Sequence, residues 1–165
     1  TGRTRAFRAR REGAAGKMII RGMKESDIMP LYALEEQCFC LSDRWSMADI
    51  RKAYELEHFF VLVAEEAEEI CGYCIVYAVM DSADIGKIAV APKARGKGIA
   101  GNLLEHLWKV CAERGIKDVI LEVRASNDAA RCLYTKYGFE TISLRKDYYK
   151  EPMEHGLTMQ KNLSE

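Results

Sequence analysis

A glycine-rich turn that separates an apolar stretch from a helical pattern is the clearest candidate for a binding site in this sequence. The turn reads Arg95-Gly96-Lys97-Gly98-Ile99-Ala100-Gly101. Apolar residues then recur at helical spacing as far as Cys111, which predicts a helix that ends near Gly115. A helix that begins at such a turn points unpaired backbone N–H groups and the positive end of its dipole outward. The turn therefore favours an anion site that would suit a diphosphate.

This turn differs from one common phosphate-binding motif and shares its glycine spacing with another. A Walker loop ends in Gly-Lys-Ser or Gly-Lys-Thr, and a dinucleotide-binding loop has a third glycine and a later acidic residue at a strand end. The Walker ending is absent here, whereas Gly96, Gly98 and Gly101 have the glycine spacing of the dinucleotide-binding loop, which is a weak signal on its own. Taken alone, two glycines at this spacing could also mark nothing more than a tight turn.

Glu122 and Tyr134 could carry proton-transfer chemistry. Glu122 stands at the end of an otherwise apolar strand pattern, where loss of water would make its carboxylate a better proton acceptor. An α-amine has a reference pKa of about 8, so it must lose a proton before it can attack. Tyr134 lies on a predicted helix that starts after Ser126-Asn127. From these patterns alone, Glu122 could equally pair with Arg124 or Lys87, and Tyr134 could simply pack against the fold.

Six cysteines raise the question of a metal site or of disulfides. Cys71 and Cys74 form a Cys-x-x-Cys pair, and Cys38 with Cys40 could complete four zinc ligands. The pair lies in a β-rich run, however, where positions three apart face opposite sides of a sheet. We predict no metal site and six reduced thiols, which is typical of a cytoplasmic protein.

The chain that must position these residues has the composition of one ordinary globular domain. It has 165 residues, of which 48% are hydrophobic and 30% charged. No apolar run reaches the roughly 18 residues that a membrane span requires. We therefore expect a single domain that does not cross a membrane.

The formal net charge of zero hides an uneven distribution. Residues 1–17 hold six Lys and Arg side chains and one Glu, which leaves residues 18–165 with a net charge of −5. An acidic body favours a basic partner. A direct nucleic-acid interface is not expected, because the basic residues concentrate in the leading segment.

Residues 1–17 show neither helical nor strand periodicity, and the first strand pattern starts at Met18. We interpret residues 1–17 as a flexible basic leader, either vector-derived or read from an upstream start, before a single domain at residues 18–165. An organelle-targeting segment is the alternative, because the leader is rich in arginine and poor in acidic residues.

Periodicity along residues 18–165 predicts a regular succession of strands and helices. Ser26 or Asp27 could cap the first helix, and Ser46 with Asp49 forms a capping-box variant before the second. The predicted ranges are a strand at 18–21, helices that begin at 28 and 46, strands at 59–65, 70–79 and 83–90, a helix from 99, a strand at 119–123, a helix from 128, and strands at 139–144 and 157–161.

This order of elements limits the fold. A strand–helix–strand crossover is parallel and right-handed, so the strands before and after the helix at 99 should be neighbours. The expected fold class is α/β, with a central mixed sheet of about seven strands and about four helices on its two faces.

Four stretches give a more specific signal. They are Ile88–Val90, Glu122-Val-Arg-Ala-Ser-Asn127, Leu133-Tyr134 with Gly138-Phe139, and Arg145-Lys-Asp-Tyr-Tyr149 with Pro152. Together with the glycine-rich turn, they resemble the RimI-type enzymes, which are the bacterial ribosomal-protein-alanine N-acetyltransferases of the GNAT superfamily. The resemblance covers residues 18–159, nearly the whole predicted domain. It implies the GNAT fold and the transfer of acetyl from acetyl-CoA to an amine.

The resemblance also implies roles for individual residues. Glu122 corresponds to the general base, and Tyr134 to the general acid that protonates the CoA thiolate. One strand N–H would hold the thioester oxygen, and the amine would attack directly in a ternary complex without a covalent enzyme intermediate. The implied acetyl-CoA contacts are Ile88, Ala89, Val90, Arg95, Gly96, Lys97, Gly98, Ile99, Ala100, Gly101 and Asn127.

Two aromatic loops are expected to wall a channel for a peptide N terminus. Trp45 lies in the first loop, and Tyr148 and Tyr149 lie in the second. Their rings could instead close the core. The sequence departs from the family pattern at Arg44-Trp45-Ser46 and at Glu154-His155-Gly156, and both departures lie on the expected substrate side.

The function that the sequence favours is acetylation of the N-terminal alanine of a small-subunit ribosomal protein by a cytoplasmic monomer. A basic ribosomal protein suits the acidic body of the chain. One alternative is a GNAT enzyme for another amine, such as a protein lysine, a polyamine or a small metabolite. The other is a non-catalytic acyl-CoA sensor, although the presence of both Glu122 and Tyr134 argues against it.

Overall fold

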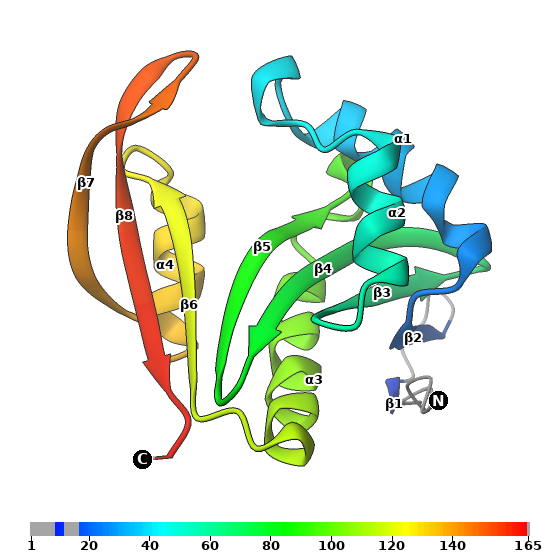
Figure 1. Cartoon of the computed structure of the whole chain (residues 1–165). Helices are drawn as coiled ribbons and strands as arrows, with labels where there is room; N and C mark the ends of the chain where they lie inside the picture. The colour runs from blue at the N-terminus through cyan, green and yellow to red at the C-terminus, as the bar shows by residue number, and fades with distance from the viewer. Residues whose placement is uncertain (1–8, 12–16, 165) are drawn as a thin grey trace.

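The computed structural model describes residues 9–11 and 17–164 (Figure 1). The four helices and the mixed sheet that the sequence predicted are present. In chain order, the elements are β1 (Ala9–Arg11), β2 (Met18–Gly22), α1 (Ile28–Cys38), α2 (Met47–Glu55), β3 (Phe59–Glu66), β4 (Glu69–Val79), β5 (Ser82–Val90), α3 (Ile99–Arg114), β6 (Asp118–Arg124), α4 (Asp128–Lys136), β7 (Glu140–Lys150) and β8 (Met153–Asn162).

The strands of the described residues form one sheet in the order β1-β2-β3-β4-β5-β6-β8-β7. β5 and β6 are parallel, as the crossover through α3 requires, and the other neighbouring pairs are antiparallel. α1 and α2 cover one face of the sheet, while α3 and α4 lie on the other face (Figure 1). No helix within the described ranges is long and apolar enough to cross a membrane.

β1 adds an eighth strand to the seven that were expected. It pairs with β2, from Ala9 opposite Ile20 to Arg11 opposite Met18. The sequence did not predict this strand, because three residues are too few to show an alternating pattern. Most of the proposed leader, residues 1–8 and 12–16, lies outside the described residues, so the division at residue 17 stays a prediction.

β5 and β6 separate after a short parallel ladder. They pair from Ser82 opposite Asp118 to Ile85 opposite Leu121, and beyond these residues they do not pair with each other. Figure 1 shows β5 and β6 diverging towards their C-terminal ends. The backbone groups on the facing edges are therefore free of a strand partner within the described chain.

A β-bulge shapes β5 where the two strands separate. The register with β4 shifts between Ile75 and Val76, which leaves Gly86 as the extra residue of β5. The indole of Trp45 packs onto this position, since a Cβ on Gly86 would lie 3.2 Å from Trp45 Cζ2. Glycine at position 86 therefore lets the segment between α1 and α2 lie close to β5.

Of the two predicted helix caps, the one before α2 is confirmed. The Ser46 hydroxyl accepts a hydrogen bond from Asp49 N–H at 3.1 Å, and the Asp49 carboxylate accepts one from Ser46 N–H at 3.0 Å. Asn127 Oδ1 caps α4 by accepting from Ala130 N–H. Neither candidate caps α1 through its side chain, because the Asp27 carboxylate is taken up by the Arg21 guanidinium at 2.6 Å and by Lys24 N–H.

The predicted loop at Tyr148–Pro152 is wrong in extent. β7 continues to Lys150 and β8 begins at Met153, so both tyrosines lie on a strand. A register shift between Arg145 and Tyr149, with Asp147 at a φ of 51°, interrupts the alternation before pairing resumes at Tyr149 opposite Glu154. This irregularity hid the second half of β7 from a pattern-based prediction.

Candidate active site

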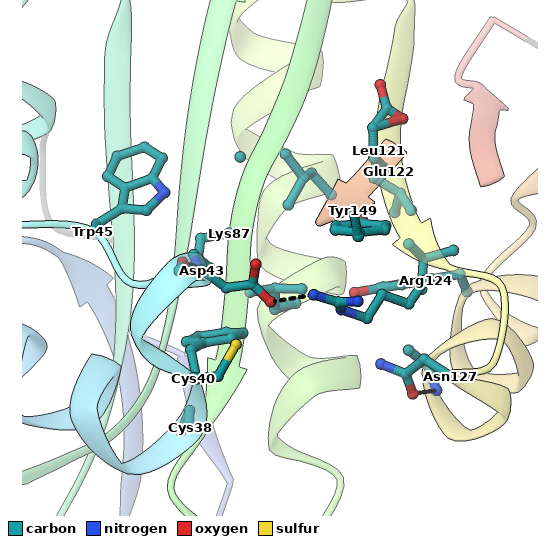
Figure 2. Close-up of a pocket in the computed structure, with 17 residues that line it drawn as sticks. Cys38, Cys40, Asp43, Trp45, Lys87, Leu121, Glu122, Arg124, Asn127 and Tyr149 are labelled. Carbon is teal, nitrogen blue, oxygen red and sulfur yellow. Dashed lines mark hydrogen bonds and ion pairs between the residues drawn. The ribbon is translucent and has the colours of Figure 1, made fainter. Parts of the chain in front are cut away.

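A cavity of about 410 Å³ lies where β5 and β6 diverge. Figure 2 shows the side chains that surround the cavity. They come from the segment between α1 and α2, from residues 85–88 of β5, from residues 121–124 of β6, from the start and middle of α4, and from Tyr149 of β7.

Glu122 projects from the C-terminal half of β6 into the wall of this cavity. Its side chain is 19% exposed, and Oε1 lies 3.9 Å from Arg145 Nη2. Oε2 is buried and has no hydrogen-bond partner within the described residues. The two other partners that the sequence allowed are engaged elsewhere, Arg124 by Asp43 and Lys87 by Glu35. Glu122 therefore presents one unused carboxylate oxygen, as a proton acceptor requires.

Tyr134 of α4 lines the same cavity and is 7% exposed. Its ring meets Phe139 edge to face, with 5.7 Å between the centroids. Burial raises the pKa of Tyr134 well above its ordinary value. The hydroxyl consequently keeps its proton at neutral pH, which suits a proton donor.

Asp84 of β5 is a second carboxylate near Glu122 that the sequence did not single out. Burial and the negative charge of Glu122 raise the pKa of Asp84, while Arg145 opposes this shift. Glu122 thus lies near one further carboxylate and one guanidinium. These charges come from β5 and β7, which lie far apart in the sequence and approach β6 only in the folded sheet.

The glycine-rich turn has the geometry of an anion site. Gly96 and Gly98 adopt φ values of 81° and 78°, which are strained for other residues, and α3 begins directly after them. Within the described residues, no side chain caps the first turn of α3. The backbone N–H groups at this helix start are therefore available to phosphate oxygens.

Some residues of the turn also make contacts within the protein, which the resemblance does not imply. Arg95 Nε donates to the Val90 carbonyl at 3.1 Å, and Lys97 Nζ lies 3.9 Å from Glu66 Oε1. A Cβ on Gly101 would collide with the Tyr137 hydroxyl, so this glycine allows α3 and α4 to touch. Arg95 and Gly101 thus have structural roles beside the predicted cofactor contacts, which stay predictions.

Ile88, Ala89 and Val90 pair with β4 on one edge only. Their other edge faces the gap left by β6 and can pair with an extended ligand that carries amides. Asn127 lies at the opposite side of the cavity (Figure 2). The open strand edge at Ile88–Val90 is thus followed along the chain by the helix start between Gly96 and Ala100, which we call the anion cradle. A long phosphorylated thioester would need both features.

The three predicted substrate residues occupy different places. Trp45 and Tyr149 line the cavity, whereas Tyr148 does not and is 42% exposed. Tyr148 and Tyr149 meet edge to face at 5.0 Å. Tyr148 can therefore act on a ligand in the cavity only through its neighbour, and its role stays a prediction.

A buried charged network, which the sequence analysis missed, fixes the segment between α1 and α2. Glu35 is fully buried, accepts from the Tyr73 hydroxyl at 2.5 Å and from Trp45 N–H at 2.9 Å, and lies 3.5 Å from Lys87 Nζ. Lys87 also donates to the Asp43 carbonyl and lies 3.7 Å from the centre of the Phe39 ring. Burial lowers the pKa of Lys87, although the charge of Glu35 opposes this.

One sequence signal could have revealed this network. Glu35 falls on the apolar face of α1, together with Leu31 and Leu34. A carboxylate on such a face needs a buried partner, because an unpaired buried charge is costly. Its partner Lys87 lies far along the chain, so the pair itself could not be read from spacing.

The cysteines give no support to a zinc site. Cys71 and Cys74 are both buried, and burial raises the pKa of each thiol. Zinc ligands must be thiolates, which such surroundings disfavour. Across residues 9–11 and 17–164, no group of three or more His, Cys, Asp or Glu side chains is placed to hold a metal.

Comparison with known proteins agrees with this geometry. The profile of the acetyltransferase (GNAT) family matches residues 28–139. The chain therefore belongs to the GNAT family of acetyltransferases, enzymes that use acetyl-CoA, and the predicted fold and enzyme class are confirmed.

Its relatives include enzymes of the RimI type. A ribosomal protein bS18-alanine N-acetyltransferase of Haemophilus influenzae is 35% identical over 134 residues, which are 81% of this chain and 89% of the relative. The crystal structure of the ribosomal-protein-S18-alanine N-acetyltransferase from Escherichia coli superposes with a TM-score of 0.82 and 28% identity, over 88% of this chain and 94% of that one. A GNAT acetyltransferase from Elizabethkingia anophelis with acetyl-CoA bound shares the fold at a TM-score of 0.73 and 21% identity, over 88% and 97% of the two chains.

Proposed function

We propose that this chain transfers acetyl from acetyl-CoA to the N-terminal alanine of ribosomal protein bS18. The observation that carries the proposal is the single cavity that holds both Glu122 and Tyr134 at the divergence of β5 and β6. The names of the RimI-type relatives support the choice of substrate. The net charge of −5 over residues 18–165 suits a basic protein partner.

The residues of the site fit acetyl-CoA. The diphosphate would bind the N–H groups between Gly96 and Ala100, and the pantetheine amides would pair with the open edge of Ile88–Val90. Acetyl-CoA supplies an acetyl group activated as a thioester. A backbone N–H of this edge would donate to the thioester oxygen as negative charge develops there.

Proton transfer falls to Glu122 and Tyr134, which both line the cavity. Glu122 would take a proton from the ammonium group of the peptide, directly or through one water molecule, and so free its lone pair for attack. The C–N bond forms as the C–S bond breaks, and Tyr134 would donate its proton to the leaving sulfur. The phenolate then regains a proton from the solvent or from the product amide nitrogen, and no enzyme side chain is acylated.

We further propose that the chain acts as a monomer in the cytoplasm, without a metal and without direct nucleic-acid contact. The buried, protonated thiols at Cys71, Cys74 and Cys111 suit a reducing compartment. Mass measurement in solution tests the monomeric state, and metal analysis of the purified protein tests the absence of a metal.

A turnover assay with three variants tests the proposed function. The acceptor is a peptide that copies the alanine-initiated N terminus of bS18. We expect Glu122→Gln and Tyr134→Phe each to reduce kcat by roughly 10²-fold to 10⁴-fold, the usual contribution of a positioned acid or base. Binding of acetyl-CoA should persist in both, because neither side chain belongs to the anion cradle.

The matched control is Arg51→Met, which removes an exposed guanidinium paired with Glu25 and Glu55 on the far side of α2. This variant should keep the activity of the wild type. Acetyl-CoA binding without turnover of the wild type would redirect the search to lysine, polyamine or metabolite amines, or to a sensor.

A further inference from the structure

Two segments that are distant in sequence meet beside the cavity, and Cys40 and Asp43 of the first segment line it. One is the segment Cys40–Asp43 between α1 and α2, and the other is the turn Glu151–Pro152 between β7 and β8. Ser42 Oγ donates to the Glu151 carbonyl at 3.5 Å, and Cys40 Sγ lies 3.7 Å from the same oxygen. We call these two segments the acceptor walls.

Arg124 connects the two acceptor walls to each other and to β6. Its Nη2 donates to Asp43 Oδ2 at 2.9 Å and to the Glu151 carbonyl at 3.1 Å, and its Nη1 donates to the Pro152 carbonyl at 2.9 Å. The guanidinium also stacks 4.3 Å from the centre of the Tyr149 ring. Figure 2 shows the Asp43–Arg124 ion pair spanning the space between the two sides of the cavity.

The chemistry of this contact requires arginine. A guanidinium offers several donors in one plane, so it can reach a carboxylate and two carbonyls while its face stacks on an aromatic ring. An ammonium group has neither the span nor the flat face. The two side chains are 18% and 29% exposed, so water screens the ion pair less than it would a surface pair.

Each acceptor wall also has its own anchor at its base. Lys87 holds the Asp43 carbonyl on one side, and on the other the Glu154 carboxylate accepts from Ser126 N–H and Oγ. Loss of Arg124 should therefore leave both walls folded, and joined only by the long contacts of Ser42 and Cys40 with the Glu151 carbonyl. Arg124 follows Glu122 by two residues on the same face of β6, so the joint lies beside the proposed base.

We propose that Arg124 is a positioning residue, which joins the acceptor walls and so holds the peptide entrance in the shape that aligns the attacking amine with Glu122. This inference rests on the proposed function for its choice of acceptor. Arg124 touches neither the reacting atoms nor the anion cradle, so its effect should fall on the acceptor and not on acetyl-CoA.

Steady-state kinetics of Arg124→Met test the proposal first. We expect KM for the bS18-derived peptide to rise about tenfold, because walls that Arg124 no longer holds must be ordered when the peptide binds, and this ordering costs binding free energy. The KM for acetyl-CoA should stay within about twofold, and the KM for alaninamide, which lacks the chain that passes between the walls, should change much less than that of the peptide. Arg124→Lys should recover little, because it cannot bridge both walls.

A coupling test separates the ion pair from the rest of the contact. Asp43→Asn should raise the peptide KM less than Arg124→Met does, and the double variant should match Arg124→Met alone, because both changes act through one contact. Asp43→Asn also serves as the second variant if Arg124→Met fails to fold. Arg51→Met is the control for the loss of a guanidinium from an ion pair.

Hydrogen exchange gives a readout that does not depend on turnover. In Arg124→Met, the backbone amides of residues 40–45 and 150–155 should exchange faster, while those of β3 and β4 stay unchanged. An unchanged peptide KM together with unchanged exchange would overturn the role of Arg124. If exchange is faster in Arg124→Met but the wild type acetylates no peptide, the connection between the acceptor walls through Arg124 is upheld and the proposed function is refuted.

Discussion

At the scale of single residues, charged side chains around the cavity are placed by partners from distant elements. Glu35 of α1, Lys87 of β5 and Tyr73 of β4 form one buried group under the segment that carries Trp45. The side chains of Lys87 and Glu35 are 9% and 0% exposed, so water reaches the Glu35 carboxylate not at all and the Lys87 side chain only slightly. The pair is tolerable only while both members are present.

We therefore expect a non-additive effect on stability at this pair. Glu35→Gln and Lys87→Met should each lower the free energy of unfolding by about 3 kcal/mol, because each leaves one buried charge unpaired. The double variant should lose less than the sum of the two. Urea unfolding followed by tryptophan fluorescence measures this, and Glu55→Gln, in an exposed ion pair with Arg51, should stay within about 0.5 kcal/mol of the wild type. Additive losses would show that the two charges are independent.

At the scale of elements, the strand edge and the helix start that form the cofactor side depend on close packing. Gly72 of β4 lies under the first turn of α3. A Cβ at this position would lie 3.0 Å from the Ala89 carbonyl oxygen and 3.2 Å from Ile99 Cγ2. Both contacts belong to the elements that were assigned to acetyl-CoA, so the absence of a side chain at Gly72 sets the distance between β5 and α3.

Gly72→Ala should therefore impair acetyl-CoA binding together with stability. We expect a loss of about 1–3 kcal/mol in the free energy of unfolding, which is usual for overpacking, and a several-fold rise in KM for acetyl-CoA. Gly22→Ala in β2 is the matched control, because a Cβ there meets nothing within 4 Å. Thermal unfolding and acetyl-CoA titration compare the two variants, and equal behaviour would contradict the packing argument.

The sequence could predict the helices and strands themselves, but not the irregular contacts between them. The spacing of apolar residues predicted α1 to α4, the crossover rule predicted the parallel β5–β6 pair, and Glu122 and Asn127 of the sequence motif both line a cavity, although their roles stay predictions. The β7 bulge and the three-residue β1 lack periodicity, so no pattern could reveal them. Arg124 was seen only as a possible partner of Glu122, because its true partner, Asp43, is 81 residues away and is brought close by the fold alone.

At the scale of the whole molecule, the sheet consists of two halves joined by a short ladder. Between β5 and β6, pairing covers only Ser82–Ile85 and Asp118–Leu121. The C-terminal half of each strand faces its neighbour without hydrogen bonds between them, and the cavity lies there. A ligand that pairs with the β5 edge while it contacts β6 or α4 would extend the connection between the two halves of the sheet.

Acetyl-CoA should therefore stabilise both halves of the sheet and not only its own contact residues. At a concentration of about 100 times Kd, the free energy of unfolding should rise by about 2.7 kcal/mol, as mass action requires for a ligand of the folded state. Hydrogen exchange should slow in residues 86–90 and also in residues 121–127. ADP, which offers a diphosphate without the pantetheine arm, should slow exchange at residues 95–101 alone. If acetyl-CoA protects no more of the sheet than ADP does, the pantetheine arm does not pair with β5, and the proposed path of the thioester between the two strands is wrong.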